Sequence, residues 1–243
     1  NLEIKNQKII LRLDLNVPLK DKIIIDDTRI TLCLPLIKRL IERKAKIIII
    51  SHLGRPKGVR DPAFSLIPIY KYLKNILQTN VYFFSGNFDN EVEDKFSQLK
   101  ESEVIVVENI RFFKEEMTDD ENFSKRLGSI GDIYINDAFS CSHRSHASIC
   151  KIAQFLRSYS GLQMEHEISV LNKITNNITR PATCIIGGSK ISTKINIIEN
   201  LITKLDNLII VGGMANNFLK YKEYKIGKSI FEKNAEPIIQ NIL

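Results

Sequence analysis

The sequence predicts an α/β fold in which parallel strands alternate with helices. Three observations support this. Short runs rich in Ile and Val alternate with longer segments whose apolar residues recur at helical spacing. These runs are apolar almost throughout, as expected for strands of a parallel sheet covered on both faces. The alternation ends near residue 161 and starts again near residue 183. The predicted fold is therefore two Rossmann-like parallel-sheet α/β domains joined by a hinge helix, the second domain being incomplete.

The first domain is expected to span residues 1–161. Its predicted strands are residues 9–13, 47–50, 81–84, 104–107 and 133–135, and its predicted helices are residues 30–43, 66–77, 92–99 and 121–127. The first helix is the clearest, because Ile30, Leu34 and Ile37 recur at helical spacing. Right-handed crossovers join parallel strands, so the carboxyl ends of these strands are expected to meet at one edge of the sheet.

A second α/β unit follows a polar helix. Residues 163–174 have a helical pattern, and the segment 162–178 is expected to be the interdomain hinge helix. The elements predicted beyond it are strands at residues 183–186 and 208–211 and a helix at residues 191–205. They form the start of a second α/β domain, residues 179–243, which is too small to be a good independent domain.

The two ends of the sequence predict that the chain is truncated. Asn1 is not an initiator Met, and residues 237–243 form an apolar helical pattern without a Gly or Asn cap. Two interpretations follow: the chain is part of a longer working protein, or the 243 residues are the whole protein.

The composition narrows the class of protein. The net charge is +7 and the pI about 9.1, but the Lys residues are scattered and no aromatic-rich basic segment accompanies them, so nucleic acid is not an expected partner. No apolar stretch approaches the roughly 18 residues of a membrane helix, and no signal peptide is visible. The cysteines show no disulfide-framework spacing, which predicts reduced thiols in a cytoplasmic protein. They are Cys33, Cys141, Cys150 and Cys184.

Cations follow three of the predicted strands. They lie in the polar turns at residues 51–57, 108–111 and 137–144. The chain has 24 Lys and only 11 Arg, so the Arg residues in these turns are expected to have a specific task. A guanidinium binds carboxylate or phosphate through two parallel hydrogen bonds, which an ammonium cannot do. The pattern predicts an anion-binding crevice at this edge of the sheet.

Individual side chains in these turns have alternative readings. His52, Arg55 and Lys57 can be held toward one small anion, or can form an ordinary polar loop. Asp14 and Asn16 can hydrogen-bond substrate hydroxyls, or can be turn residues. Arg29 lies near a helix N-terminus and favours phosphate there, or is a surface charge. His143 and Arg144 are expected to be anion ligands.

Two further segments suggest metal or phosphate chemistry. Two Cys and two His fall within residues 141–150, but their spacing fits no common zinc framework, so no metal site is expected. Residues 187–194 contain Gly187-Gly188 between a predicted strand and helix, which favours phosphate binding although the segment is not a Walker A loop. Lys190 and Lys194, four residues apart, are expected to share a helix face.

Taken together, the motifs of this chain resemble the phosphoglycerate kinase family. The segments that carry the resemblance are residues 12–18, 26–30, 51–57, 108–112, 136–139, 143–146 and 187–194. They occur in the order expected for that family and extend the resemblance over residues 1–243. The resemblance implies two α/β domains that face each other across a hinge. The first would bind 3-phosphoglycerate and the second the Mg-nucleotide.

The resemblance also implies the role of each candidate residue. The residues that would bind the phosphoglycerate are Asp14, Asn16, Arg29, His52, Arg55, Arg111 and Arg144. Those that would contact the nucleotide or the transferring phosphate are Lys190, Lys194 and Gly213. Arg29 and Lys190 would be catalytic, because they would neutralise charge on the transferring group.

The implied reaction is reversible phosphoryl transfer between 1,3-bisphosphoglycerate and ADP, giving 3-phosphoglycerate and ATP in glycolysis. It would be in-line, without a covalent enzyme intermediate. Mg²⁺ would be carried with ADP or ATP, with no protein ligand in this chain. The expected partners are these small molecules, with neither nucleic acid nor membrane, and the expected state is a monomer.

The chain departs from the family pattern at several places. Leu15 replaces the usual Phe, Ser140-Cys141-Ser142 replaces a Gly-containing stretch, and Val211 stands where a third Gly is usual. The acidic Gly-Gly-Asp-Thr segment of the family and its C-terminal segment have no counterpart before Leu243.

Three functions remain open from the sequence. The first is a phosphoglycerate kinase, and the alternative is a truncated, catalytically inactive fragment that binds 3-phosphoglycerate. A nicotinamide dehydrogenase is disfavoured because no G-x-G-x-x-G follows the first strand.

Overall fold

The computed structural model describes residues 3–89, 92–176 and 178–243. Asn1 and Asn177, which bear on the expected truncation and hinge, lie outside the described residues. The chain divides into two compact units at Glu167 and Ile168, and each is described here by itself. Whether the functional domains have the boundaries expected from the sequence stays a prediction.

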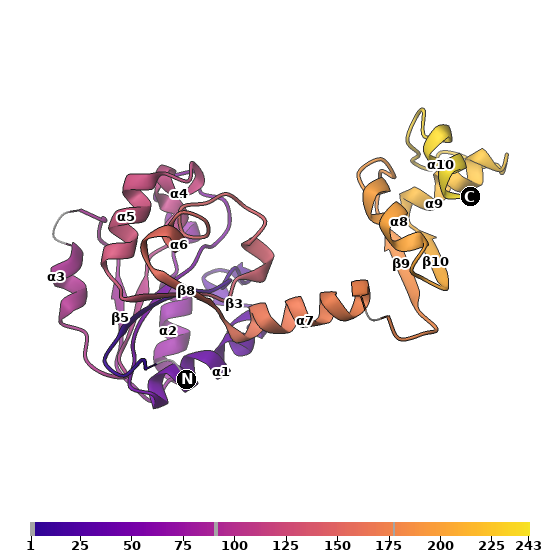
Figure 1. Ribbon diagram of the computed structural model, residues 1–243. Helices are drawn as coiled ribbons and strands as arrows, with labels where there is room; N and C mark the ends of the chain where they lie inside the picture. The colour runs from indigo at the N-terminus through magenta and orange to yellow at the C-terminus, as the bar shows by residue number, and fades with distance from the viewer. Residues whose placement is uncertain (1–2, 90–91, 177) are drawn as a thin grey trace. The chain divides into compact units, whose positions relative to one another are not determined.

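The first unit is a parallel sheet with helices on both faces (Figure 1). Its strands are β1 (Lys8–Arg12), β4 (Lys46–Ile50), β5 (Val81–Phe84), β6 (Val104–Val107), β7 (Ile133–Asn136) and β8 (Arg157–Ser160), with a small hairpin of β2 (Leu19–Lys20) and β3 (Ile23–Ile24). Its helices are α1 (Thr28–Glu42), α2 (Ile67–Ile76), α3 (Val92–Ser97), α4 (Lys114–Met117), α5 (Glu121–Ser129) and α6 (Ile152–Phe155). Helix α7 (Leu162–Asn176) begins in this unit. The six long strands follow the order β5-β6-β4-β1-β7-β8, and every pair is parallel. The predicted α/β class with a parallel sheet is confirmed.

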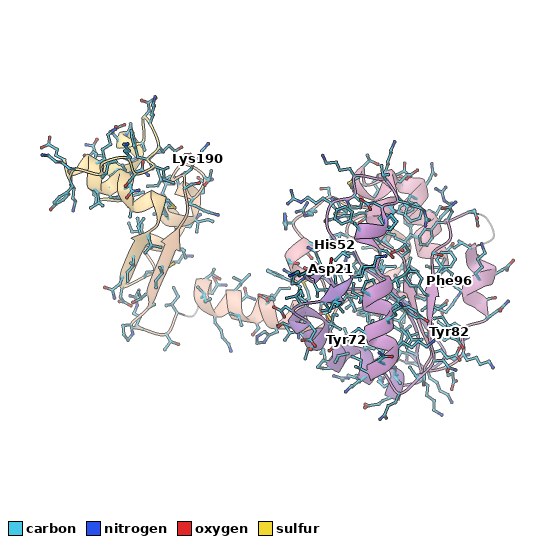
Figure 2. The ribbon with its side chains drawn as sticks, turned by 180° about the vertical axis from the view of Figure 1, so that it is seen from behind. Asp21, His52, Tyr72, Tyr82, Phe96 and Lys190 are labelled. Atoms are coloured by element: carbon cyan, nitrogen blue, oxygen red, sulfur yellow. The ribbon has the colours of Figure 1, made fainter. Side chains whose placement is uncertain are left out.

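Alternate residues along the central strands enter two separate cores, as the near-continuous apolar runs predict. On β1, Ile9 and Leu11 belong to the core that α1 and α2 cover, whereas Ile10 belongs to the core on the opposite face. Phe96 of α3, which Figure 2 labels, and Phe123 of α5 belong to that second core. Burial on both faces fixes the register of the strands, because a shift by one residue would exchange the two sets of side chains.

The second unit is smaller. It contains the strands β9 (Thr183–Gly187) and β10 (Asn207–Val211) and the helices α8 (Ile195–Ile202), α9 (Gly213–Tyr221) and α10 (Glu236–Ile242). The two strands are parallel neighbours, and one of their faces packs on a core that includes Ile198 and Met214. The other face is exposed, with Ile185 at 66% and Ile209 at 46% exposure.

The structure corrects one expectation about local structure and adds one strand that was not expected. The predicted helix at residues 191–205 begins only at Ile195, because residues 191–194 form a turn that ends at Lys194. Strand β8 was not predicted, since its sequence, Arg-Ser-Tyr-Ser, is polar and exposed at the sheet edge rather than apolar. Among the described residues, no helix is long and apolar enough to cross a membrane.

Candidate anion-binding site

The candidate site lies at the carboxyl ends of the central strands. Arg12, the last residue of β1, pairs in register with Ile50 of β4 and with Asn136 of β7. The chain leaves β1 for β4 on one side and returns to β7 on the other, so β1 is the point where the strand order reverses. In open α/β sheets, a crevice forms at such a point. The turns after these strands are therefore brought together although they are far apart in the sequence.

These turns enclose a cavity of about 230 Å³. Its lining residues are Asp14, Asn16, Arg29, His52, Gly54, Arg55, Arg111, Ser140, Cys141 and Arg144. All seven residues expected to bind the phosphoglycerate are among them. Lys57 and His143, which are both exposed, do not line the cavity, so the expectation that they are anion ligands there is not supported. The four guanidinium groups outnumber the single carboxylate, so the cavity favours an anion.

Asp14 and Asn16 are held in place by the turns around them. The Asp14 carboxylate accepts hydrogen bonds from Arg29 and from the hydroxyl of Ser140. Asn16 Oδ1 accepts from the backbone N–H of Gly54 at 2.8 Å. Burial acts to raise the pKa of Asp14, but the hydrogen bond from Ser140 and the charge of Arg29 outweigh it and hold the pKa below its usual value. Asp14 is therefore a fixed, ionised acceptor beside the cations.

Arg111 has unused hydrogen-bonding capacity. It is 5% exposed and lies in the 3-10 helix Ile110–Phe112, whose first turn is capped by the side chain of Asn109. Its Nη1 donates to the carbonyl of Gly54 at 2.9 Å, whereas no described residue accepts from its Nε or Nη2. Burial lowers the pKa of Arg111, as do the nearby cations Arg144 and Arg12. Buried donors without partners are rare, so this edge of the guanidinium fits an anion with two oxygens.

His52 is neutral and has a defined tautomer. Burial lowers its pKa to about 2, and the cations Arg12 and Arg111 contribute. Its Nδ1 lies 3.3 Å from Nη2 of Arg12. A guanidinium can only donate, so Nδ1 accepts and Nε2 carries the proton. His52 can therefore act as a hydrogen-bond donor toward an anion while remaining uncharged.

A buried network behind His52 supports this arrangement, and its role was not predicted from the sequence. Arg12 is fully buried, and its Nε donates to Oγ of Ser148 at 3.0 Å. Glu116, also fully buried, accepts from Oγ of Ser148 at 2.7 Å and from its backbone N–H at 2.8 Å. The sequence did contain an indication of this network, because Arg12 stands at the end of an apolar strand. A charge buried there needs polar partners, since an isolated buried charge is very costly.

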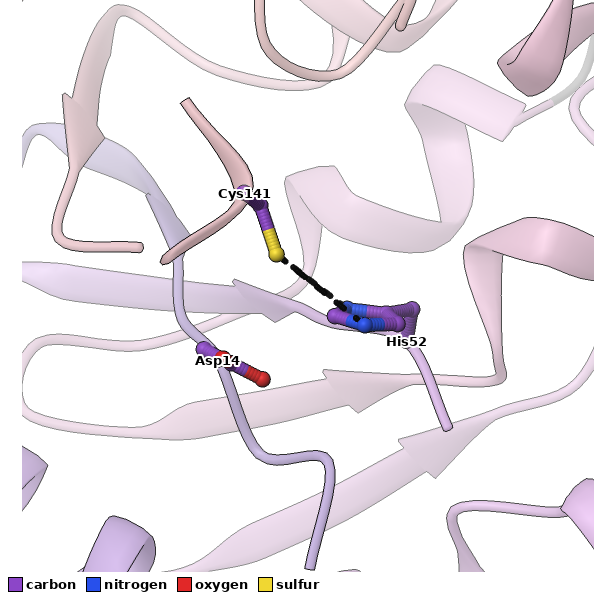
Figure 3. A group of neighbouring side chains, drawn as sticks. All are labelled: Asp14, His52 and Cys141. Atoms are coloured by element: carbon purple, nitrogen blue, oxygen red, sulfur yellow. Dashed lines mark hydrogen bonds between the residues drawn. The ribbon is translucent and has the colours of Figure 1, made fainter. Parts of the chain in front are cut away.

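The same cavity contains a group of metal-donor types. Among the described residues, Asp14, His52 and Cys141 form the only group of three such side chains, with donor atoms within 4.8 Å of one another (Figure 3). A metal needs an imidazole nitrogen with a free lone pair. Nδ1 of His52 uses its lone pair for Arg12, and Nε2 carries the proton. This tautomer and the surrounding guanidinium groups make the group a poor cation site.

A larger cavity of about 620 Å³ lies elsewhere in the first unit. Its charged lining residues are Lys22, Arg60, Lys71, Asp21, Asp61 and Glu108. Three cations and three carboxylates balance one another there. Despite its size, this cavity therefore lacks the excess of guanidinium groups that makes the smaller one suitable for an anion.

In the second unit, two glycine turns lie at one edge of the β9–β10 sheet. Gly187 pairs in register with Val211, so the turns that follow both strands leave the same edge. Gly212 has a φ of 67°, and the backbone N–H of Met214 donates to the carbonyl of Gly188 at 2.9 Å. Gly213 begins α9 directly after this turn. A Cβ on Gly213 would lie 2.8 Å from Cδ1 of Ile230, so a larger residue there would require the exposed Ile230 side chain to move.

Lys190 and Lys194 do not share a helix face. Lys190 is exposed in the turn after β9, where Figure 2 labels it, and Lys194 is the N-cap of α8. The expectation of a common helix face is therefore wrong. Both ammonium groups still belong to the turn that follows β9, so their contact with nucleotide stays a prediction.

The neutral state of His52 predicts a pH-dependent loss of stability. An unfolded chain would protonate His52 below pH 6.5, whereas the folded chain resists protonation until about pH 2. This contribution to stability is present above pH 6.5 and is lost as the pH falls below it. Between pH 7 and pH 5, we expect the free energy of unfolding to fall by about 2 kcal/mol more than in the His52→Gln variant. Urea unfolding at both pH values measures this difference, and equal losses in the two proteins would contradict the buried neutral imidazole.

The fold and site define an α/β protein with a small, arginine-rich anion cavity at the carboxyl edge of its sheet. The sequence profile of phosphoglycerate kinase matches residues 1–243. The chain is 45% identical to the phosphoglycerate kinase of Wolbachia pipientis wMel over 243 residues, covering 100% of this chain and 61% of that protein. It is 44% identical to that of Dictyoglomus turgidum over 241 residues, 99% of this chain and 61% of that protein. The chain belongs to the phosphoglycerate kinase family.

A solved structure supports the same assignment. The phosphoglycerate kinase of Coxiella burnetii matches with a TM-score of 0.86 and 36% identity, over 100% of this chain and 61% of that chain. This chain thus spans about 61% of the length of the curated relatives described above.

Proposed function

We propose that this chain is part of a glycolytic phosphoglycerate kinase and that its first unit binds 3-phosphoglycerate. One observation carries the proposal. The seven side chains chosen from the sequence line a single cavity, in which Arg111 has two buried donors without described partners. The family supports the reaction, which is reversible phosphoryl transfer between 1,3-bisphosphoglycerate and ADP, giving 3-phosphoglycerate and ATP.

The proposed contacts follow from the chemistry of each group. Arg55, Arg111 and Arg144, with the Nε2–H of His52, would bind the anionic oxygens of the phosphate and carboxylate. Asp14 and Asn16 provide oxygen and amide groups for the hydroxyl. Arg29, paired with Asp14 at the edge of the cavity, would stabilise charge on the transferring group.

The nucleotide is assigned to the glycine turns of the second unit. Lys190, Lys194 and Gly213 would contact ADP or ATP, and Lys190 would also meet the transferring phosphate. Mg²⁺ would arrive with the nucleotide and neutralise charge on its phosphates. A cytoplasmic location and a monomeric state stay predictions.

A pair of neighbouring cations tests the substrate assignment. Arg55 lines the cavity and Lys57, two residues later, does not. We expect Arg55→Ala to weaken 3-phosphoglycerate binding by about tenfold to a hundredfold, because a charge-assisted hydrogen bond contributes roughly 1.5–3 kcal/mol. Lys57→Ala should bind within about threefold of the unaltered chain, since losing a screened surface charge changes the binding energy little. Isothermal titration calorimetry measures the affinity of the unaltered chain and of both variants. Equal losses of affinity in Arg55→Ala and Lys57→Ala would count against a specific site.

A separate assay decides whether the chain also transfers phosphate. Production of ATP from 1,3-bisphosphoglycerate and Mg-ADP would establish the kinase. Binding of 3-phosphoglycerate without turnover would instead establish the alternative of an inactive binding fragment.

A further inference from the structure

Cys141 is a nucleophilic group in the anion cavity that the proposed reaction does not use, and it packs with Ala138 and Ile149. It ends the 3-10 helix Phe139–Cys141 and lines the cavity, although its residue is only 4% exposed. Its Sγ lies 3.9 Å from Nδ1 and 4.0 Å from Nε2 of His52 (Figure 3). A small reagent that enters the cavity therefore meets a thiol beside the anion-binding groups.

Cys141 lies among cationic side chains. Cys141 and the guanidinium of Arg111 interact electrostatically, and Arg144 also lines the cavity. The carboxylate of Asp14 is close to the sulfur but is paired with Arg29. Reactive cysteines are found in such electropositive surroundings because the thiolate, rather than the thiol, is the nucleophile.

Arg111 provides the second observation. Its Nε and Nη2 are buried donors without a partner among the described residues, and Arg111, which is 5% exposed, lines the same cavity as this thiol. An oxygen anion on the sulfur would give these donors an acceptor inside the protein. It would then occupy the groups that are assigned to the phosphorylated substrate.

Cys33 provides a contrast within the same unit. It lies in the apolar core of α1, where burial and the charges of Asp137 and Asp14 raise its pKa to about 12. That thiol stays protonated at neutral pH and is a poor nucleophile. Cys150 is exposed, so it serves as a reference for a freely accessible thiol.

We propose that Cys141 is an oxidation site for small hydroperoxides, and that its sulfinate closes the anion cavity to phosphorylated substrates. The inference rests on the proposed function for the identity of the ligand that is displaced. The sulfinate of the oxidised cysteine would accept hydrogen bonds from Arg111. Its negative charge would repel an anionic substrate that enters the same cavity. This makes the cavity a redox-sensitive site.

The chemistry requires two equivalents of hydroperoxide. The thiolate attacks the outer oxygen, an S–O bond forms, the O–O bond breaks, and the leaving alkoxide or hydroxide takes up a proton. Sulfur loses two electrons and becomes a sulfenic acid, while the peroxide is reduced to an alcohol or water. A second equivalent repeats the step and gives the sulfinate, which is anionic at neutral pH.

The test compares chains before and after treatment with hydrogen peroxide. Peptide mass spectrometry gives the oxidation state of each cysteine, and calorimetry gives the affinity for 3-phosphoglycerate. We expect Cys141 to gain two oxygen atoms while Cys33 stays reduced. We expect affinity to fall at least about tenfold, because the sulfinate places a like charge beside the bound anion. The Cys141→Ser variant should bind 3-phosphoglycerate equally well before and after peroxide treatment. The Cys150→Ser variant should lose affinity on treatment, as the unaltered chain does.

The outcomes separate this inference from the proposed function. If Cys141 stays reduced while Cys150 is oxidised, or if the oxidised chain binds as before, the inference is overturned. Loss of affinity in treated Cys141→Ser would also overturn it, because another group would then be responsible. Failure of the untreated chain to bind 3-phosphoglycerate would count against the proposed function, and the mass measurement would still decide whether Cys141 is oxidised.

Discussion

Arg111→Met is expected to remove most of the affinity for 3-phosphoglycerate. Arg111 is buried and lines the cavity, one of its nitrogens is fixed by the carbonyl of Gly54, and its Nε and Nη2 have no partner among the described residues. Loss of one partner from a buried charged contact costs about 2–5 kcal/mol, which raises Kd at least about thirtyfold. Calorimetric titration measures the change.

Arg39→Met is the matched control. Arg39 is exposed in the last turn of α1 and does not line the cavity. The Arg39→Met substitution removes the same charge from the protein without removing a contact in the site. Its Kd for 3-phosphoglycerate should therefore change by less than about threefold. If both variants weakened binding equally, net charge rather than the cavity would account for affinity.

Glu116→Ala is expected to give the largest loss of stability. Glu116 is fully buried and accepts two hydrogen bonds from Ser148, which in turn accepts from the buried Arg12. Removing the carboxylate leaves the guanidinium of Arg12 buried with no carboxylate in this network. Such a change costs about 3–5 kcal/mol of unfolding free energy. Urea unfolding followed by circular dichroism, which suits a chain without Trp, measures it.

Glu115→Ala provides the comparison for this change. Glu115 is the preceding residue in α4 and is exposed. Its removal should change the free energy of unfolding by less than about 0.5 kcal/mol, as is usual for surface substitutions. A similar loss in both variants would show that α4, rather than the buried network, determines the effect.

The sequence predicted the sheet well because its strands are short, strongly apolar and separated by helical patterns. It also predicted which turns converge. Parallel strands have their carboxyl ends at one edge, so Arg55 and Arg144 could be placed together from the shared direction of the strands. The same reasoning could not decide how far a side chain reaches. Lys57 and His143 are in the same turns and lie outside the cavity.

Other features depended on long-range packing that local patterns do not contain. The role of Arg12 became clear only when Ser148 and Glu116, more than 100 residues away, were placed beside it. Strand β8 has no apolar run because it lies at an exposed edge. The turn at residues 191–194 replaced a predicted helical start, because apolar spacing alone does not define where a helix begins.

The central claim is that the arginine-rich cavity of the first unit binds a small phosphorylated acid through Arg111. Nuclear magnetic resonance of the Arg side-chain Nε–H groups tests it most directly, during titration with 3-phosphoglycerate. The account predicts that the Arg111 signal shifts and saturates with the ligand, while the signal of Arg39 stays unchanged. An unchanged Arg111 signal at saturating ligand, or equal shifts of both signals, would contradict it.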